Sequence, residues 1–188
     1  MSNFPDYKII NKVDDLLYIQ TKFFKDERGF FNEFYNDKFI SQFIPNFKIK
    51  QISLSQSKKN VFRGMHFQLK PNISKIMRVI KGKAVLLAID ISKRNNKRII
   101  SSKVIEDPSI LIWAPAHYAR GFISLTKETT IEYLQSGYFS ATKEFKITLP
   151  NKKIIKDYLG SDYKIGAEDK GAISIDKWYK SHYDLFFK

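Results

Sequence analysis

Residues 61–68 read VFRGMHFQ, a stretch rich in β-favouring apolar and aromatic side chains that predicts a strand. Strict alternation puts His66 and Gln68 on one face, and Gly64 permits a bulge that brings Arg63 near them. A polar face on such a strand is either the solvent side of a sheet or the wall of a cavity. The aromatic neighbours and the pairing of Arg63 with His66 favour a cavity that holds a base and an anion-binding group.

Further short strands, separated by turn signals, are expected along the chain. They cover Leu16–Phe24, Phe30–Tyr35, Lys48–Ser55, Ile110–Trp113 and Phe145–Leu149. Two hairpins are also predicted: Ile76–Ile91, bending at residues 81–83, and Phe122–Leu125 with Thr130–Gln135. Short helices are expected over Lys38–Phe43, Lys152–Leu159 and Ile175–Tyr183. Many short strands indicate an all-β sandwich or jelly roll, with short helices in the C-terminal tail and one domain spanning residues 1–188.

Composition narrows the class of protein. The 188 residues carry a formal net charge of +14, contain no cysteine and include 43% hydrophobic residues. The absence of cysteine excludes disulfides, iron–sulfur sites and a thiol nucleophile. The positive charge is mostly lysine scattered along the chain, which indicates a lysine-coated surface rather than a nucleic-acid-binding face. Without an apolar run long enough for a membrane span or a signal peptide, a cytoplasmic protein with no membrane or nucleic-acid partner is expected.

Few other residues are candidates for metal binding or acid–base catalysis. The chain has three histidines and no His-x-His pair, so a cupin-type metal site is not expected. Lys75 inside an apolar cavity could stabilise an oxyanion, and Tyr133 could act as an acid. Each has a plain alternative, because Lys75 could be one more surface lysine and Tyr133 could simply pack in a sheet. Asp169 lies in a polar stretch that by itself indicates nothing.

Several motifs occur together in a fixed order. They are DERGFF (26–31) with Glu33, SKKNVFRGMHFQ (57–68), KIMRV (75–79), Ile89-Asp90, WAP (113–115), ARGF (119–122), and Tyr133 ahead of Tyr138-Phe139. In this order and spacing the chain resembles the dTDP-4-dehydrorhamnose 3,5-epimerase family from about residue 15 to about residue 145.

The resemblance implies a cupin-like double-stranded β-helix, a homodimer that exchanges N-terminal strands, and epimerisation of a nucleotide-linked 4-keto sugar without a cofactor or metal. It assigns His66 as the base, Asp169 as its partner, Lys75 as the oxyanion-binding group and Tyr133 as the acid. Substrate contacts would fall on Arg28, Glu33, Gln51, Arg63, Arg120 and Tyr138. The chemistry agrees, since a proton next to a ketone is removable only when the enolate is stabilised.

Two departures from the family pattern concern the substrate. Arg120 stands where the family usually has histidine, and Leu86 stands where it has aspartate. We therefore expect either a dTDP-4-keto-6-deoxyhexose or a GDP-4-keto-heptose of surface-polysaccharide biosynthesis as the substrate, inverted at C3 and C5. The alternatives are inversion at C3 alone, a 3,4-ketoisomerase on the same fold, and a non-catalytic module that binds sugar or nucleic acid.

Overall fold

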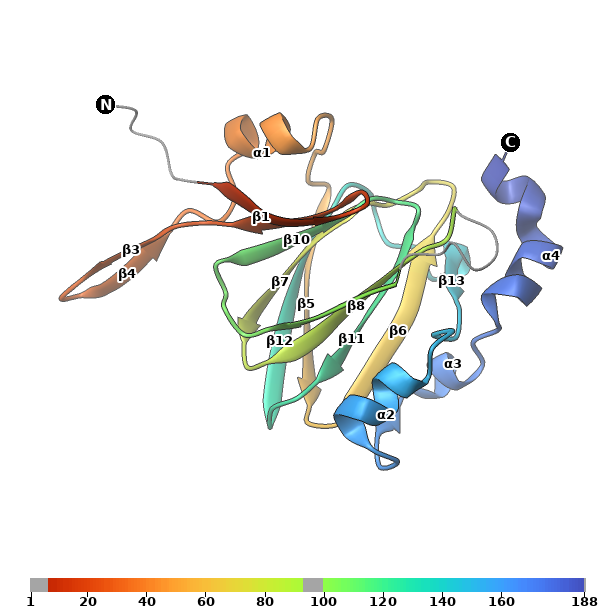
Figure 1. Ribbon diagram of the computed structural model, residues 1–188. Coiled ribbons are helices and arrows are strands. Elements are labelled where there is room, and N and C mark those ends of the chain that lie inside the picture. Colours follow the sequence, from red (N-terminus) through yellow and green to blue (C-terminus); the bar gives the residue numbers. More distant parts are fainter. Residues whose placement is uncertain (1–6, 93–99, 188) are drawn as a thin grey trace.

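Two antiparallel sheets face each other in the computed structural model, which describes residues 7–92 and 100–187 (Figure 1). In spatial order, the first sheet contains β1 (Lys8–Val13), β2 (Leu16–Gln20), β10 (Ile110–Ala114), β7 (Lys75–Lys81), β12 (Glu128–Gln135) and β5 (Gln51–Lys58). The second contains β13 (Glu144–Lys146), β6 (Val61–Gln68), β11 (Tyr118–Ser124), β8 (Ala84–Asp90) and β9 (Ile100–Ile105). This is the cupin-like double-stranded β-helix that the resemblance implies.

The strand predicted over residues 61–68 is confirmed with the same bounds as β6. Both predicted hairpins are wrong, although strands and bends occur where expected. β7 pairs with β10 and β12 in the first sheet, whereas β8 pairs with β9 and β11 in the second. Likewise β11 and β12 lie in different sheets. Each bend therefore carries the chain across from one sheet to the other. The hairpins were wrongly predicted because the apolar pattern of a strand does not indicate which neighbouring strand it pairs with.

A two-stranded arm projects from the barrel near the N-terminus (Figure 1). It consists of β3 (Phe23–Asp26) and β4 (Gly29–Asn32), which pair only with each other among the described strands. The single strand predicted over Leu16–Phe24 is therefore divided between β2 and β3. The helix predicted next is confirmed as α1 (Asp37–Phe43), and the side chain of Asn36 caps it by accepting a hydrogen bond from the backbone of Lys38.

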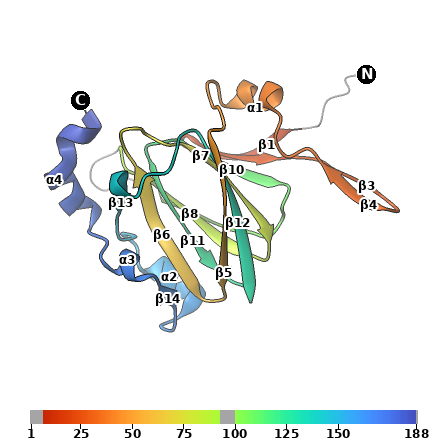
Figure 2. The ribbon, with the colours of Figure 1, turned by 180° about the vertical axis from the view of Figure 1, so that it is seen from behind.

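Three apolar clusters hold these layers together. One fills the space between the sheets, one lies under α1 on the outer face of the first sheet, and one lies between the second sheet and the C-terminal helices. Figure 2 shows these helices beside the second sheet, away from the first. These helices are α2 (Lys153–Leu159), α3 (Ala167–Lys170) and α4 (Ile175–Phe187), and Trp178 of α4 is completely buried. β8 is buried on both faces, which explains its apolar sequence from Ala84 to Ile89. A short β14 (Lys164–Ile165) runs parallel to β6 and leads into α3.

None of the helices in the described part of the chain is long and apolar enough to cross a membrane.

Candidate active site

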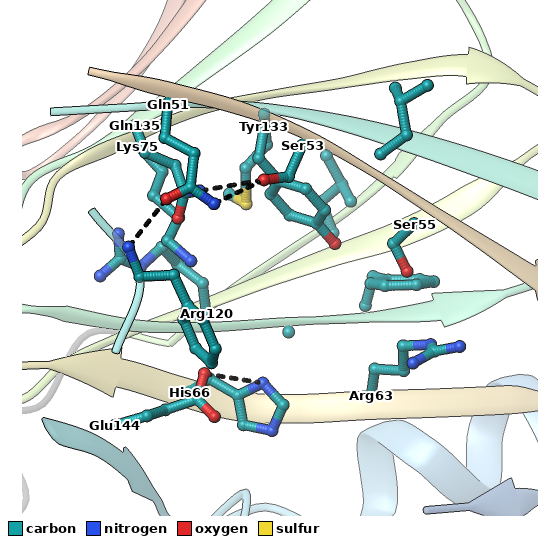
Figure 3. Close-up of a pocket in the computed structure, with 16 residues that line it drawn as sticks. Gln51, Ser53, Ser55, Arg63, His66, Lys75, Arg120, Tyr133, Gln135 and Glu144 are labelled. Atoms are coloured by element: carbon teal, nitrogen blue, oxygen red, sulfur yellow. Dashed lines mark hydrogen bonds and ion pairs between the residues drawn. The ribbon is translucent and has the colours of Figure 1, made fainter. Parts of the chain in front are cut away.

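A cavity of about 460 Å³ opens between the two sheets, a size typical of small-molecule sites (Figure 3). Polar side chains reach it from both walls. The first sheet contributes Gln51, Ser53, Ser55, Lys75, Tyr133 and Gln135. The second contributes Arg63, His66, Arg120 and Glu144. The cavity-wall interpretation of the 61–68 strand is the one that the structure supports.

A bulge between β6 and β11 puts Arg63 and His66 on the same wall. The register shifts there, so that Arg120 lies opposite His66 while Phe122 lies opposite Arg63. Gly64 has a φ of +129°, and a Cβ on Gly121 would lie 2.6 Å from the carbonyl oxygen of Arg63. The two strands can approach this closely only because both positions are glycine. The predicted bulge at Gly64 is thus confirmed.

His66 is held from behind by Asp169 of α3. Nε2 of His66 and Oδ1 of Asp169 are 2.6 Å apart, and Oδ2 of Asp169 accepts a hydrogen bond of 3.3 Å from the backbone of Gly64. Burial raises the pKa of this carboxyl, but the contacts with His66, Gly64 and Lys146 outweigh burial and leave it below its usual value. An ionised carboxylate only accepts, so Nε2 carries its hydrogen and Nδ1 is the nitrogen that can accept a proton.

Glu144 of β13 lies on the other side of the same ring. Its Oε1 is 3.8 Å from Nδ1 of His66, and its side chain is largely buried (Figure 3). Glu144 was not predicted as a site residue, because a lone glutamate one residue before a predicted strand gives no signal. Ser53 and Gln135 were missed as well. The alternation of Lys48–Ser55 could have indicated Ser53, since it separates a Gln-Ser-Ser row from an Ile-Leu row.

Lys75 and Tyr133 lie together on the first sheet, across the cavity from His66. Nζ of Lys75 is 5.6 Å from the centre of the Tyr133 ring. Burial, reinforced by the positive charge of Arg120, lowers the pKa of Lys75 to about 7, although Glu144 acts in the opposite direction. Burial raises the pKa of the Tyr133 phenol above its ordinary value, against the smaller effects of Arg63 and Ser55. The phenol is therefore protonated at neutral pH.

Three other predicted site residues lie in or beside the cavity. Gln51 lines it and accepts a 2.8 Å hydrogen bond from the backbone of Phe139, which also lines it. Phe139 belongs to one of the motifs but was not predicted as a site residue. Tyr138 is 69% exposed and does not line the cavity, but its carbonyl oxygen accepts a hydrogen bond from Gln68. Arg63 is held by Ser57, 2.9 Å from its Nε, which directs the guanidinium along β5.

Arg28 and Glu33 lie away from this cavity within the same chain. Arg28 is at the tip of the β3–β4 arm, 84% exposed and paired with Asp26 (Figure 1). The carboxylate of Glu33 accepts a hydrogen bond from Asn36 ahead of α1. The chain itself therefore does not bring these two residues together with His66.

The described residues contain no group of three or more His, Asp or Glu side chains arranged to hold a metal ion. An acid–base pocket enclosed by a jelly roll places the chain in the class of cupin-like enzymes that act on small molecules.

Comparison with known proteins identifies the family within this class. The sequence model of dTDP-4-dehydrorhamnose 3,5-epimerase matches residues 11–177. The enzyme of that name from Salmonella typhimurium is 30% identical over 170 residues, which cover 88% of this chain and 93% of the relative. The one from Shigella flexneri is 30% identical over 150 residues, covering 78% and 83%. The chain belongs to the dTDP-4-dehydrorhamnose 3,5-epimerase family and is an isomerase.

The fold agrees with a solved structure of the same kind. The crystal structure of dTDP-6-deoxy-D-glucose-3,5-epimerase from Legionella pneumophila, in complex with dTDP-4-keto-L-rhamnose, superposes with a TM-score of 0.82. The two chains are 26% identical, and the match covers 91% of this chain and 94% of that one.

Proposed function

We propose that the cavity epimerises a nucleotide-linked 4-keto sugar without a cofactor. Nδ1 of His66 takes the proton from the carbon next to the ketone, and the electrons of the broken C–H bond form a C=C bond to C4. The ketone oxygen becomes an enolate oxyanion beside the ammonium of Lys75. The Tyr133 phenol then gives a proton to the opposite face of the same carbon while the C=O bond re-forms. His66 keeps the abstracted proton during this step. Exchange with solvent then removes that proton from His66 and returns a proton to the Tyr133 phenolate.

The observation that carries this proposal is the placement of base and acid on opposite sheets. His66 lies on β6 of the second sheet, whereas Lys75 and Tyr133 lie on β7 and β12 of the first (Figure 3). A flat sugar ring between these walls presents one face to each. Inversion requires that the proton leave one face and return to the other, so two walls with separate proton-transfer groups provide the necessary geometry.

The protonation states fit these roles. The Tyr133 phenol keeps its proton, because burial raises its pKa. The Lys75 amine, with a pKa of about 7, is partly protonated at neutral pH. Asp169 holds the His66 ring through Nε2 and leaves Nδ1 for the substrate proton, as a carboxylate orients the histidine of a hydrolase triad.

The preferred substrate is a dTDP-linked 4-keto-6-deoxyhexose of surface-polysaccharide biosynthesis. The names of the Salmonella and Shigella relatives and the ligand of the Legionella structure support this choice. Arg63 is the candidate for the nucleotide end, since a guanidinium suits a pyrophosphate. Gln51 is level with Lys75 in the first sheet and is a candidate for the sugar end. A GDP-4-keto-heptose is the second candidate, because the unusual Arg120 alters the sugar end of the cavity.

We further propose that the chain is one domain that works as a homodimer through its N-terminal arm. The arm exposes large apolar side chains, with Phe24, Phe30 and Phe31 being 45%, 67% and 64% exposed. Such a surface favours a protein partner over solvent. A second copy that receives the arm would bring Arg28 to a neighbouring subunit, which accounts for the distance of Arg28 from its own cavity.

The decisive experiment incubates the protein in D2O with dTDP- and GDP-linked 4-keto sugars and reads the products by mass spectrometry and NMR. We expect deuterium at C3 and C5 of the dTDP-linked sugar, and a loss of most exchange in His66→Asn. Deuterium at C3 alone would limit the enzyme to one centre, and a 3-keto product would indicate a ketoisomerase. Exchange that is unchanged in His66→Asn would refute the mechanism, and absence of exchange with every sugar would refute the function.

A further inference from the structure

The side chain of Arg120 crosses from the second sheet to the first at the end of the cavity that holds Lys75. It starts on β11 of the second sheet, and both of its terminal nitrogens donate 2.9 Å hydrogen bonds to the carbonyl oxygen of Ile73. Ile73 precedes β7 of the first sheet by two residues. The side chain is 4% exposed, so it is a fixed strut between the sheets rather than a mobile surface arginine.

The carbonyl group that Arg120 binds lies two residues before Lys75. Lys75 is the first residue of β7, and its amine shares the cavity with Arg120. The other titratable groups that line this part of the cavity are His66, Tyr133 and Glu144, and Glu144 is the only carboxylate among the residues lining the cavity. Two neighbouring cations, Arg120 and Lys75, therefore face a single carboxylate. A lysine loses its proton more readily than an arginine, so deprotonation of Lys75 is what relieves the repulsion between them.

We propose that Arg120 is a positioning residue for Lys75: its double hydrogen bond to Ile73 fixes the start of β7, and its positive charge disfavours a second positive charge on the neighbouring amine. The inference rests on the proposed function for the purpose of the lysine, but not for its test. Burial lowers the pKa of Arg120 to about 9, against the effect of Glu144, so the guanidinium is charged at neutral pH. Its charge then helps burial to bring the pKa of Lys75 down to about 7.

The protonation of Lys75 makes the exchange rate depend on pH. The Lys75 amine is protonated below pH 7 and neutral above it, so its help to the enolate is lost as pH rises through about 7. Without the charge of Arg120 the amine keeps its proton to higher pH. The alkaline side of the exchange profile therefore moves upward when Arg120 is made neutral, whereas a purely structural role would lower the rate equally at every pH.

The first test needs no substrate. Trace acetylation of the folded protein over a range of pH, read by peptide mass spectrometry, gives the midpoint at which each amine becomes reactive. Exposed Lys58 and Lys59 in the same digest are internal controls. We expect wild-type Lys75 to become reactive near pH 7, well below these controls. A Lys75 midpoint equal to theirs would overturn the inference in the wild-type protein itself.

Variants then separate charge from shape. In Arg120→Met and Arg120→Gln we expect the Lys75 midpoint to move upward by roughly one pH unit, the size of a Coulomb interaction in a partly buried site. Arg120→Gln also retains a donor for the Ile73 carbonyl, which provides a folded neutral variant if Arg120→Met unfolds. Arg120→Lys keeps the charge and should keep the midpoint. A midpoint that stays at the wild-type value in the folded neutral variants would overturn the proposal.

The same variants carry a functional readout. In the D2O exchange assay, the alkaline midpoint of kcat should move with the labelling midpoint, up in Arg120→Gln and unchanged in Arg120→Lys. Arg120→Lys should still lower kcat, because one ammonium cannot grip a carbonyl oxygen as two guanidinium nitrogens do. Failure of the wild-type protein to exchange any sugar would refute the proposed function, while the labelling result would still decide the role of Arg120.

Discussion

The contact between Asp169 and His66 predicts that Asp169→Asn abolishes most of the exchange activity. The substitution keeps the shape of the side chain and removes its charge. Asp169 is 8% exposed and lies 2.6 Å from Nε2 of His66, so the lost contact is a buried, charge-assisted hydrogen bond. An amide can also donate to Nε2, which would move the ring hydrogen to Nδ1, the nitrogen that must accept the substrate proton.

The size of the effect follows from the strength of such a bond. Hydrogen bonds to charged groups contribute about 1.5–3 kcal/mol. At about 1.4 kcal/mol for each factor of ten, the rate of deuterium incorporation at C3 should fall by about 10–150-fold. The measurement is the initial rate of exchange in D2O at saturating 4-keto sugar, with a thermal unfolding curve to show that the variant is folded.

Glu168→Gln provides a matched control. Glu168 is the neighbouring residue on α3, its side chain is 82% exposed, and it pairs with Lys146 at the surface. The control removes the same charge from the same helix without touching His66, so its rate should stay within about twofold of wild type. If Asp169→Asn keeps more than a third of the wild-type rate, or if both variants lose activity alike, the contact between Asp169 and His66 is not what makes His66 an effective base.

Three further predictions concern the acid, the bulge and the arm. Tyr133→Phe should still exchange deuterium at C3 but yield little inverted sugar, as NMR of the product would show, because the base can return a proton to its own face; normal inversion would exclude Tyr133 as the acid. Gly121→Ala should lower the free energy of unfolding in urea by about 1–3 kcal/mol, since its Cβ would lie 2.6 Å from a β6 carbonyl. Gly171→Ala, whose Cβ would meet nothing closer than 3.6 Å, should unfold like wild type. Replacing Phe30 and Phe31 together by Asp should convert a dimer to monomers in light scattering, and an unchanged mass would separate the arm from the dimer contact.

Local sequence was enough to place most of the secondary structure. β6, α1, α2 and α4 are bounded by turn signals and contain their own apolar runs, so a short window contains the information, whereas the four-residue α3 was not predicted. β9 was missed, because Ile100–Ile105 mixes small polar residues with isoleucine and its inward face is filled by serine as well as apolar side chains. The position of Asp169 behind His66 depended on the family resemblance, since the two residues are 103 positions apart and nothing local links them.

The rest of the site depends on which sheet each strand joins, which the sequence around a turn does not determine. A hairpin at Gly82 would put Lys75 and Leu86 on neighbouring strands of one sheet. Instead the chain crosses over at Gly82 and again after β11, and the two crossings are tied together because the backbone of Lys83 donates to Thr126. Each crossing moves the next strand to the opposite wall. The connection from β6 to β7 is a crossing of the same kind, and it puts Lys75 on the wall facing His66, while the crossing after β11 brings Tyr133 to the wall of Lys75. A turn motif alone could not reveal these crossings, and they give the two faces of a substrate different chemistry.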